Sequence, residues 1–128
     1  MILLQDILAE SGLTDTMQIL GIGQLSCKWD TGADTRASAL HAEDIHVHHG
    51  QVTWTCQGRT HTAPCIGYSR PRGKHTRPIV ELHATWRGHT VHAAFALTDR
   101  GAMSTDVLCN LQLMRQLGVH VDLNKGLQ

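Results

Sequence analysis

The hydrophobic positions of this chain fall mostly in short runs of the kind that β-strands use. Residues 17–29 combine aliphatic and β-branched side chains with glycine breaks, which predicts two short strands. Ile45 and Val47 alternate with two histidines before Gly50, so we expect a strand with one apolar face. Most of the chain is therefore predicted to be β-structure.

Two hairpins are predicted in the middle of the chain. Strand-like runs at residues 51–56 and 59–65 flank a turn at residues 57–58. The run at residues 79–98 folds back at residues 87–88, where Arg-Gly interrupts the apolar pattern.

The two ends of the chain carry the spacing of short helices. Residues 2–10 predict an amphipathic helix, and residues 111–117 predict a second one that a following glycine stops. A final strand is expected after it. With no internal repeat or linker, we predict one domain over residues 1–128, with a helical extension at residues 1–16 and a core at residues 17–123.

Composition narrows the classes of function. Eleven Lys and Arg balance eleven Asp and Glu, so net charge gives no reason to expect nucleic acid or a membrane as partner. No apolar run approaches the roughly 20 residues of a membrane span. The first residues lack the basic region of a signal peptide, so we expect a cytoplasmic protein.

The cysteines predict no disulfide framework and no zinc ribbon, because none of them forms a C-x-x-C pair. In a reducing compartment we expect four small buried thiols. They are Cys27, Cys56, Cys65 and Cys109.

Asp30, Thr31 and Gly32 form the motif to which chemistry can be assigned. Apolar residues before Asp30 place it at the end of a predicted strand. Thr31 supplies a hydroxyl that can hold the turn, and Gly32 allows another backbone to approach closely. The three residues could also form only a structural turn, since Asp and Gly are common there.

A catalytic Asp30 needs a second carboxylate. A lone Asp, with a pKa of about 3.9, activates water poorly at neutral pH. Two carboxylates that share a proton can act as base and acid together. The chain has a single Asp-Thr-Gly, so the partner would come from a second copy, with Asp30 facing its mate across a two-fold axis.

Five blocks in order around this motif resemble the retropepsin-like aspartic proteases, and among them a bacterial family described as ATP-dependent zinc proteases. The blocks are LGIGQLSCKWDTGA (20–33), SALHA (38–42), RPIVEL (77–82), ALTDRGAMSTDVL (96–108) and VHVD (119–122).

The resemblance implies an all-β fold, a small closed or partly open retropepsin-like (acid protease) barrel with one or two short helices. It implies an aspartic-type endopeptidase, a hydrolase that acts as a homodimer on a peptide or protein substrate without a cofactor. By the same resemblance, Asp30 is the catalytic aspartate, and Thr31 and Gly32 complete its turn.

Two differences from the family pattern leave an alternative open. Two extra residues are present near Arg36 and Ala37, and Cys109-Asn110 stands where the family has Gly-Arg. The alternative is a catalytically inactive peptide-binding or assembly module with the same fold.

The substrate contacts are expected at Ala33, next to the catalytic turn, and at Arg70 and Arg72 in a loop rich in proline and basic residues. The lid over the substrate is either the turn at residues 57–58 or this loop, residues 67–77. The charge of the loop favours acidic substrates, and its glycines and proline suit a hinge.

The ten histidines raise the question of a metal site. His46 and His48 share a strand face, so chelation is geometrically possible, and a His-rich metal-binding protein is a third hypothesis. A solvated strand face is the simpler interpretation. The chain has neither H-E-x-x-H nor a phosphate-binding loop, and we predict no metal ligands and no ATP site.

Overall fold

The computed structural model describes residues 2–3, 13–30, 35–119 and 121–122. Strands dominate these ranges, as the hydrophobic pattern predicts. The strands and the helix are β1 (Ile2–Leu3), β2 (Leu13–Ile19), β3 (Gly23–Trp29), β4 (Ser38–His41), β5 (Glu43–His48), β6 (Gln51–Cys56), β7 (Arg59–Pro64), β8 (Gly67–Ser69), β9 (Arg77–Trp86), β10 (His89–Thr98), β11 (Val107–Cys109), α2 (Leu111–Leu117) and β12 (Val121–Asp122).

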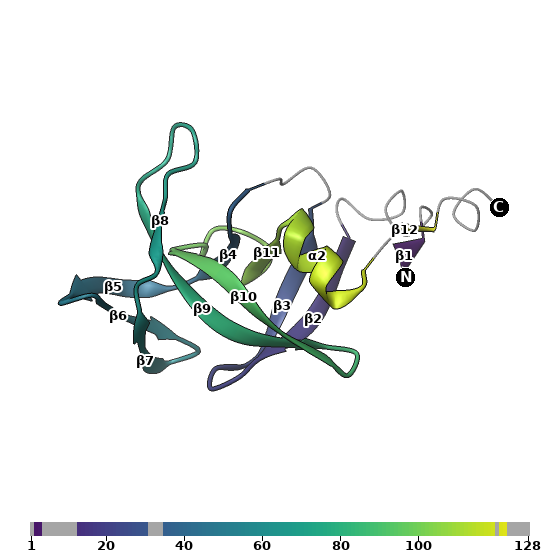
Figure 1. Cartoon of the computed structure of the whole chain (residues 1–128), viewed down its shortest axis with the longest axis horizontal. Coiled ribbons are helices and arrows are strands. Elements are labelled where there is room, and N and C mark those ends of the chain that lie inside the picture. The colour runs from purple at the N-terminus through teal and green to yellow at the C-terminus, as the bar shows by residue number, and fades with distance from the viewer. Residues whose placement is uncertain (1, 4–12, 31–34, 120, 123–128) are drawn as a thin grey trace.

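Six strands close into a barrel in the order β10-β4-β11-β3-β2-β9, and β9 pairs with β10 to complete the ring (Figure 1). Most neighbours are antiparallel, but β4 runs parallel to β10, and β11 runs parallel to β3. β8 pairs with the beginning of β9 and leads into a loop that projects from the barrel. A separate sheet of β5, β6 and β7 lies beside the barrel.

Three tight turns explain why the hairpins form where the sequence predicts them. Residues 49–50, 57–58 and 87–88 connect consecutive strands, and φ is positive at both residues of each turn. Such a mirror-image turn matches the right-handed twist of the strands and favours glycine, which each pair has at its second position. Both predicted hairpins are confirmed.

The core includes residues of both the barrel and the β5-β6-β7 sheet, and aromatic side chains anchor it. Trp29, Trp54 and Trp86 are all buried, as expected from their size. Trp29 meets Trp86 edge to face with 5.3 Å between ring centroids, and the Trp86 indole Nε1 donates to Asp15 at 3.0 Å. The buried part of β5 is shorter than the alternation suggests, because Ile45 packs on the core whereas Val47 is exposed.

The helix predicted after the barrel is confirmed as α2, and its buried face packs against β10. Asn110 caps its first turn, and Gly118 ends it in the left-handed conformation with φ of 76°. The final strand expected after it is present as β12. No helix in the described ranges is long and apolar enough to cross a bilayer.

The N-terminal helical extension is the expectation that the structure corrects. Ile2–Leu3 form a strand that pairs in parallel with β12, and residues 4–12 lie outside the described residues. β2 already begins at Leu13, since residues 13–16 continue the antiparallel ladder with β3. At Ile2–Leu3 and at residues 13–16, strand pairing therefore takes the place of the predicted helical extension.

Candidate functional site

Asp30 lies where two parallel strands of the barrel end together. It directly follows β3, and its backbone N–H donates to the carbonyl of Cys109, the last residue of the neighbouring β11, at 3.1 Å. Asp30 itself is half-buried. The expected partners in the turn, Thr31 and Gly32, lie outside the described residues, as does Ala33.

A cavity of about 400 Å³ opens beside Asp30. One wall comes from β10 and the segment after it, and another from the loop that follows β8. A further wall comes from residues 35–39, which lead into β4. Segments far apart in sequence thus converge on the carboxylate, which sequence order alone does not predict.

The cavity has cationic side chains among its lining residues. Lys74 and Arg77 come from the projecting loop and the start of β9, and Arg100 from the segment after β10. Arg100 is buried, and its guanidinium donates to the carbonyl of Thr105 at 3.2 Å. Burial first, and then the nearby positive charge of Arg77, lower the pKa of Arg100. These three cationic side chains outnumber the two carboxylates, Asp30 and Asp99, among the lining residues.

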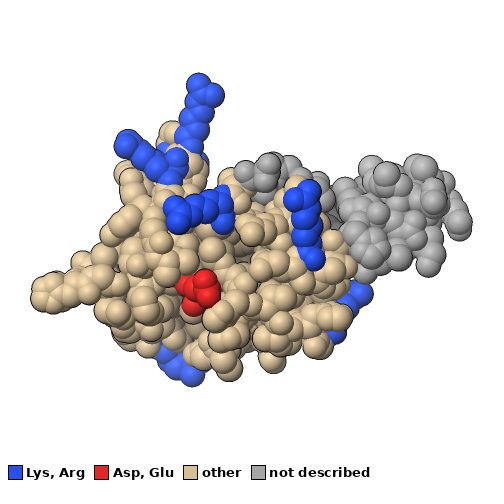
Figure 2. Space-filling model, in the orientation of Figure 1, with Lys and Arg blue, Asp and Glu red and all other residues tan. Residues whose placement is uncertain are grey.

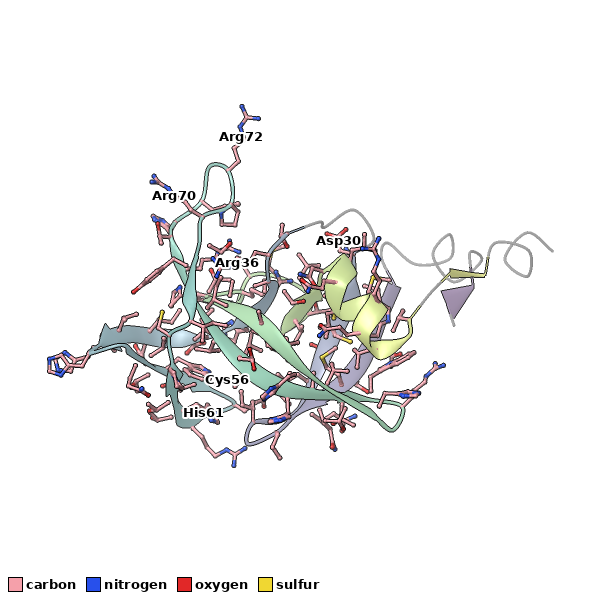
Figure 3. All side chains as sticks on the ribbon, in the orientation of Figure 1. Asp30, Arg36, Cys56, His61, Arg70 and Arg72 are labelled. Carbon is pink, nitrogen blue, oxygen red and sulfur yellow. The ribbon has the colours of Figure 1, made fainter. Side chains whose placement is uncertain are left out.

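Arg70 and Arg72 do not line the cavity. Both are exposed and project away from the barrel at the loop (Figure 3). The space-filling view shows basic side chains gathered around this loop (Figure 2). The basic character expected of the loop is present, but Lys74 and Arg77 are the basic residues from it that reach the cavity.

The structure also separates the two segments considered as a lid. The loop between β8 and β9 borders the cavity through Ser69, Pro71 and Lys74. The turn at residues 57–58 belongs to a different sheet, and the adjacent Arg59 donates to the carbonyl of Ile22 at 2.6 Å. Of the two, only the loop lies beside Asp30.

A hydrogen-bond network centred on the buried Asn110 supports residues 35–38, at the beginning of β4. Asn110 Nδ2 donates to the Thr35 carbonyl at 2.8 Å, and its Oδ1 accepts from Ser38 Oγ at 3.1 Å. The same Oδ1 accepts from Leu113 N–H as the helix cap at 2.8 Å. Sequence reasoning missed this network, although an Asn directly before a predicted helix is a recognised cap signal.

Cys109 is a packed thiol, as expected. It is fully buried, and burial raises its pKa well above the usual value, so the thiolate needed by a nucleophile is disfavoured. Its side chain neighbours that of Cys27 on the adjacent strand. All four cysteines are free. Three are buried as expected, whereas Cys65 is only half-buried.

His41, Glu43 and Asp99 form the one group in the described ranges whose side chains converge closely enough for a metal ion. His41 Nδ1 accepts the backbone N–H of Arg100 at 2.8 Å, so the ring proton resides on Nε2 and points to Glu43 Oε1 at 3.1 Å. Both ring nitrogens are thus engaged, and this geometry favours a hydrogen-bonded group over a metal site.

The histidines that the sequence singles out for chelation lie elsewhere. His46 and His48 are exposed on β5, and His48 stacks on His49 with 4.0 Å between ring centroids. Among the described residues, neither joins a group that could hold a metal. An exposed strand face is what the structure supports for them.

Comparison with known proteins establishes the fold and no more. No protein-family model matches the chain, and a search of curated proteins finds no match. A similar solved structure is the crystal structure of Lpg0085, a DUF785 protein of unknown function from Legionella pneumophila. The TM-score is 0.72 over 88% of this chain and 92% of that chain, at 20% sequence identity.

Proposed function

We propose that this protein is an aspartic-type endopeptidase with a retropepsin-like fold, in which Asp30 and its symmetry mate in a homodimer activate water. The observation that carries the proposal is the position of Asp30. It follows a barrel strand, its backbone is held by the Cys109 carbonyl, and it lines a cavity of about 400 Å³. A carboxylate beside a cavity of this size can meet a bound peptide.

The proposed chemistry uses the two carboxylates in different protonation states. The ionised one takes a proton from water as the water oxygen attacks the peptide carbonyl carbon. The protonated one gives its proton to the carbonyl oxygen. Collapse of the tetrahedral intermediate then breaks the C–N bond. The leaving nitrogen takes the proton that the first carboxyl group gained from water, and the second carboxylate regains a proton from a hydroxyl group of the intermediate. No covalent intermediate is required.

The strands near the two ends of the chain support a dimer. β1 and β12 form a two-stranded sheet, and no other described strand pairs with either. An isolated two-stranded sheet is marginally stable in water. Addition of the same strands from a second copy would extend it with backbone hydrogen bonds, in the self-complementary manner of a two-fold interface.

The lining of the cavity supports acidic peptides as substrates. Lys74, Arg77 and Arg100 offer positive charge, and Arg100 is already largely desolvated. An acidic side chain that pairs with these groups is favoured over a neutral one. The loop at residues 70–76 is the proposed lid, because it borders the cavity and connects β8 to β9.

Replacement of Asp30 tests the proposal. Asp30→Asn should abolish cleavage in a set of acidic and neutral fluorogenic peptides, whereas Asp44→Asn should not. Asp44 is an exposed control whose positive φ asparagine tolerates. If a dimer needs both carboxylates, only wild-type homodimers are active. An equilibrated 1:1 mixture of wild type and Asp30→Asn should then have about a quarter of the activity of pure wild type at the same total protein concentration. Full activity in the pure Asp30→Asn protein would refute the proposal.

A second candidate function is a catalytically inactive peptide-binding module with the same cavity. The observation that favours it is Cys109, because a buried thiol fills the position where the family pattern has glycine. This function predicts that acidic peptides bind without cleavage from about pH 4 to pH 8. Cleavage that depends on Asp30 excludes it.

A further inference from the structure

The segment at residues 35–38, between the catalytic motif and β4, is docked at both of its ends. Asn110 holds the Thr35 carbonyl at 2.8 Å, and Ser38 Oγ accepts the Asn110 backbone N–H at 3.0 Å. Arg36 and Ala37 lie between these anchors. The two extra residues relative to the family pattern lie near them.

Arg36 lies directly against the base of the proposed lid. A Cβ built on Gly67, the first residue of β8, would come within 2.8 Å of Nη2 and 3.2 Å of Cζ of Arg36. The guanidinium therefore occupies the space that a side chain at position 67 would need. Figure 3 shows Arg36 beside the root of the loop, whereas Arg70 and Arg72 point outward.

Ala37 makes a second, apolar contact at the root of the loop, where β8 pairs with β9. It is buried in a small cluster with Ile79 and Ala96. Ile79 is the register partner of Gly67 in the β8–β9 ladder. Two consecutive residues thus contact both strands at the root of the loop, one through its guanidinium and one through its methyl group.

We propose that Arg36 is a positioning residue that couples the segment following Asp30 to the proposed lid by packing its guanidinium on Gly67. The contact holds β8 at a fixed place relative to the wall that residues 35–39 contribute to the cavity. A role of Arg36 in substrate turnover rests on the proposed peptidase function. The contact between Arg36 and Gly67, and its effect on the loop, do not depend on that function.

Glycine is required at position 67 for the contact to form. Substitution by alanine would displace the guanidinium, the far end of a flexible side chain, rather than backbone. Gly67 also has a φ of 158°, which L side chains rarely adopt, so Gly67→Ala should strain the start of β8 as well as displace the guanidinium. Because Gly67→Ala would meet no guanidinium in an Arg36→Ala background, its effect on the loop should be smaller there than in the wild type.

Amide hydrogen exchange of the full chain without substrate tests the coupling. Arg36→Ala should speed exchange in residues 67–77 about fivefold, which corresponds to a contact of about 1 kcal/mol. Arg36→Gln keeps a planar group and should restore part of the protection. Arg87→Ala, the loss of an arginine that packs on Trp86 instead, should leave the loop unchanged.

The kinetic readout is a separate measurement on acidic peptides. A positioning role predicts that Arg36→Ala raises KM about fivefold with a smaller change in kcat, and that Arg36→Gln recovers most of the loss. Unchanged exchange in Arg36→Ala, or additive effects in the double variant with Gly67→Ala, would overturn the coupling. If Arg36→Ala alters exchange in the loop but the wild-type protein cleaves no peptide, the coupling is supported and only the peptidase function is refuted.

Discussion

Replacement of Asn110 by alanine removes three hydrogen bonds from a side chain that is only 3% exposed. Oδ1 accepts from the Leu113 N–H and from Ser38 Oγ, and Nδ2 donates to the Thr35 carbonyl. Loss of the helix cap costs about 1 kcal/mol. The buried Ser38 hydroxyl and the carbonyl of the exposed Thr35 each lose a hydrogen bond, at about 1 kcal/mol each. We expect Asn110→Ala to lower the free energy of unfolding by about 3 kcal/mol.

Asn110→Ser separates the helix cap from the other two hydrogen bonds. Serine is as good a helix cap as asparagine, but its shorter side chain should lose the bonds to Thr35 and Ser38. The serine variant should therefore lose about 2 kcal/mol, about 1 kcal/mol less than the alanine variant. Urea unfolding followed by fluorescence of the three buried tryptophans measures both, with an unchanged m-value as the condition for comparison.

The refuting results are specific. If Asn110→Ala lowers the free energy of unfolding by no more than the loss of an exposed helix cap does, about 1 kcal/mol, the buried network contributes nothing to stability. If Asn110→Ser unfolds at the wild-type midpoint, the bond between Asn110 and Thr35 does not stabilise the segment at residues 35–38. A double-mutant cycle with Ser38→Ala should show coupling of about 1 kcal/mol between the two side chains, and zero coupling would contradict the geometry.

Two further predictions concern the thiols. Burial raises the pKa of Cys56 from its usual 9.0 to about 11, so the unfolded thiol ionises first and stability should fall as pH rises between these values. Urea midpoints across this range should fall less steeply in Cys56→Ala than in wild type, and an equal or steeper fall would argue against the burial effect. Cys65 is the half-buried thiol, so a chromogenic disulfide reagent should label it first in the native protein. A rapid phase that persists in Cys65→Ser would show this assignment to be wrong.

The hairpins and α2 could be predicted because their determinants are local. An X-Gly pair between β-rich runs selects a tight mirror-image turn, and an apolar repeat ended by glycine selects a short helix. The N-terminal helix was predicted on equally local grounds and is wrong at Ile2–Leu3. There the deciding interaction is a ladder with Val121–Asp122, more than a hundred residues away in sequence.

The candidate site shows the same division. Asp30 at the end of a strand follows from the apolar residues before a turn signal, and the basic character of the projecting loop follows from composition. The sequence does not show which basic residues reach the cavity. Successive side chains of a strand face opposite sides, and the path of the loop depends on its connection to β9. The structure brings Lys74 and Arg77 to the cavity and leaves Arg70 and Arg72 exposed.

The sequence by itself determined the β-rich class, the turns, the single helix after the barrel and the single Asp-Thr-Gly motif, because each depends on neighbours within a few residues. Only the tertiary structure decided the closure of the barrel, the convergence of Arg100 and the loop on Asp30, and the hydrogen bonds of Asn110. It also decided that both ring nitrogens of His41 are engaged. These arrangements join segments separated by tens of residues, and their geometry is fixed by strand register and core packing, which no local pattern encodes.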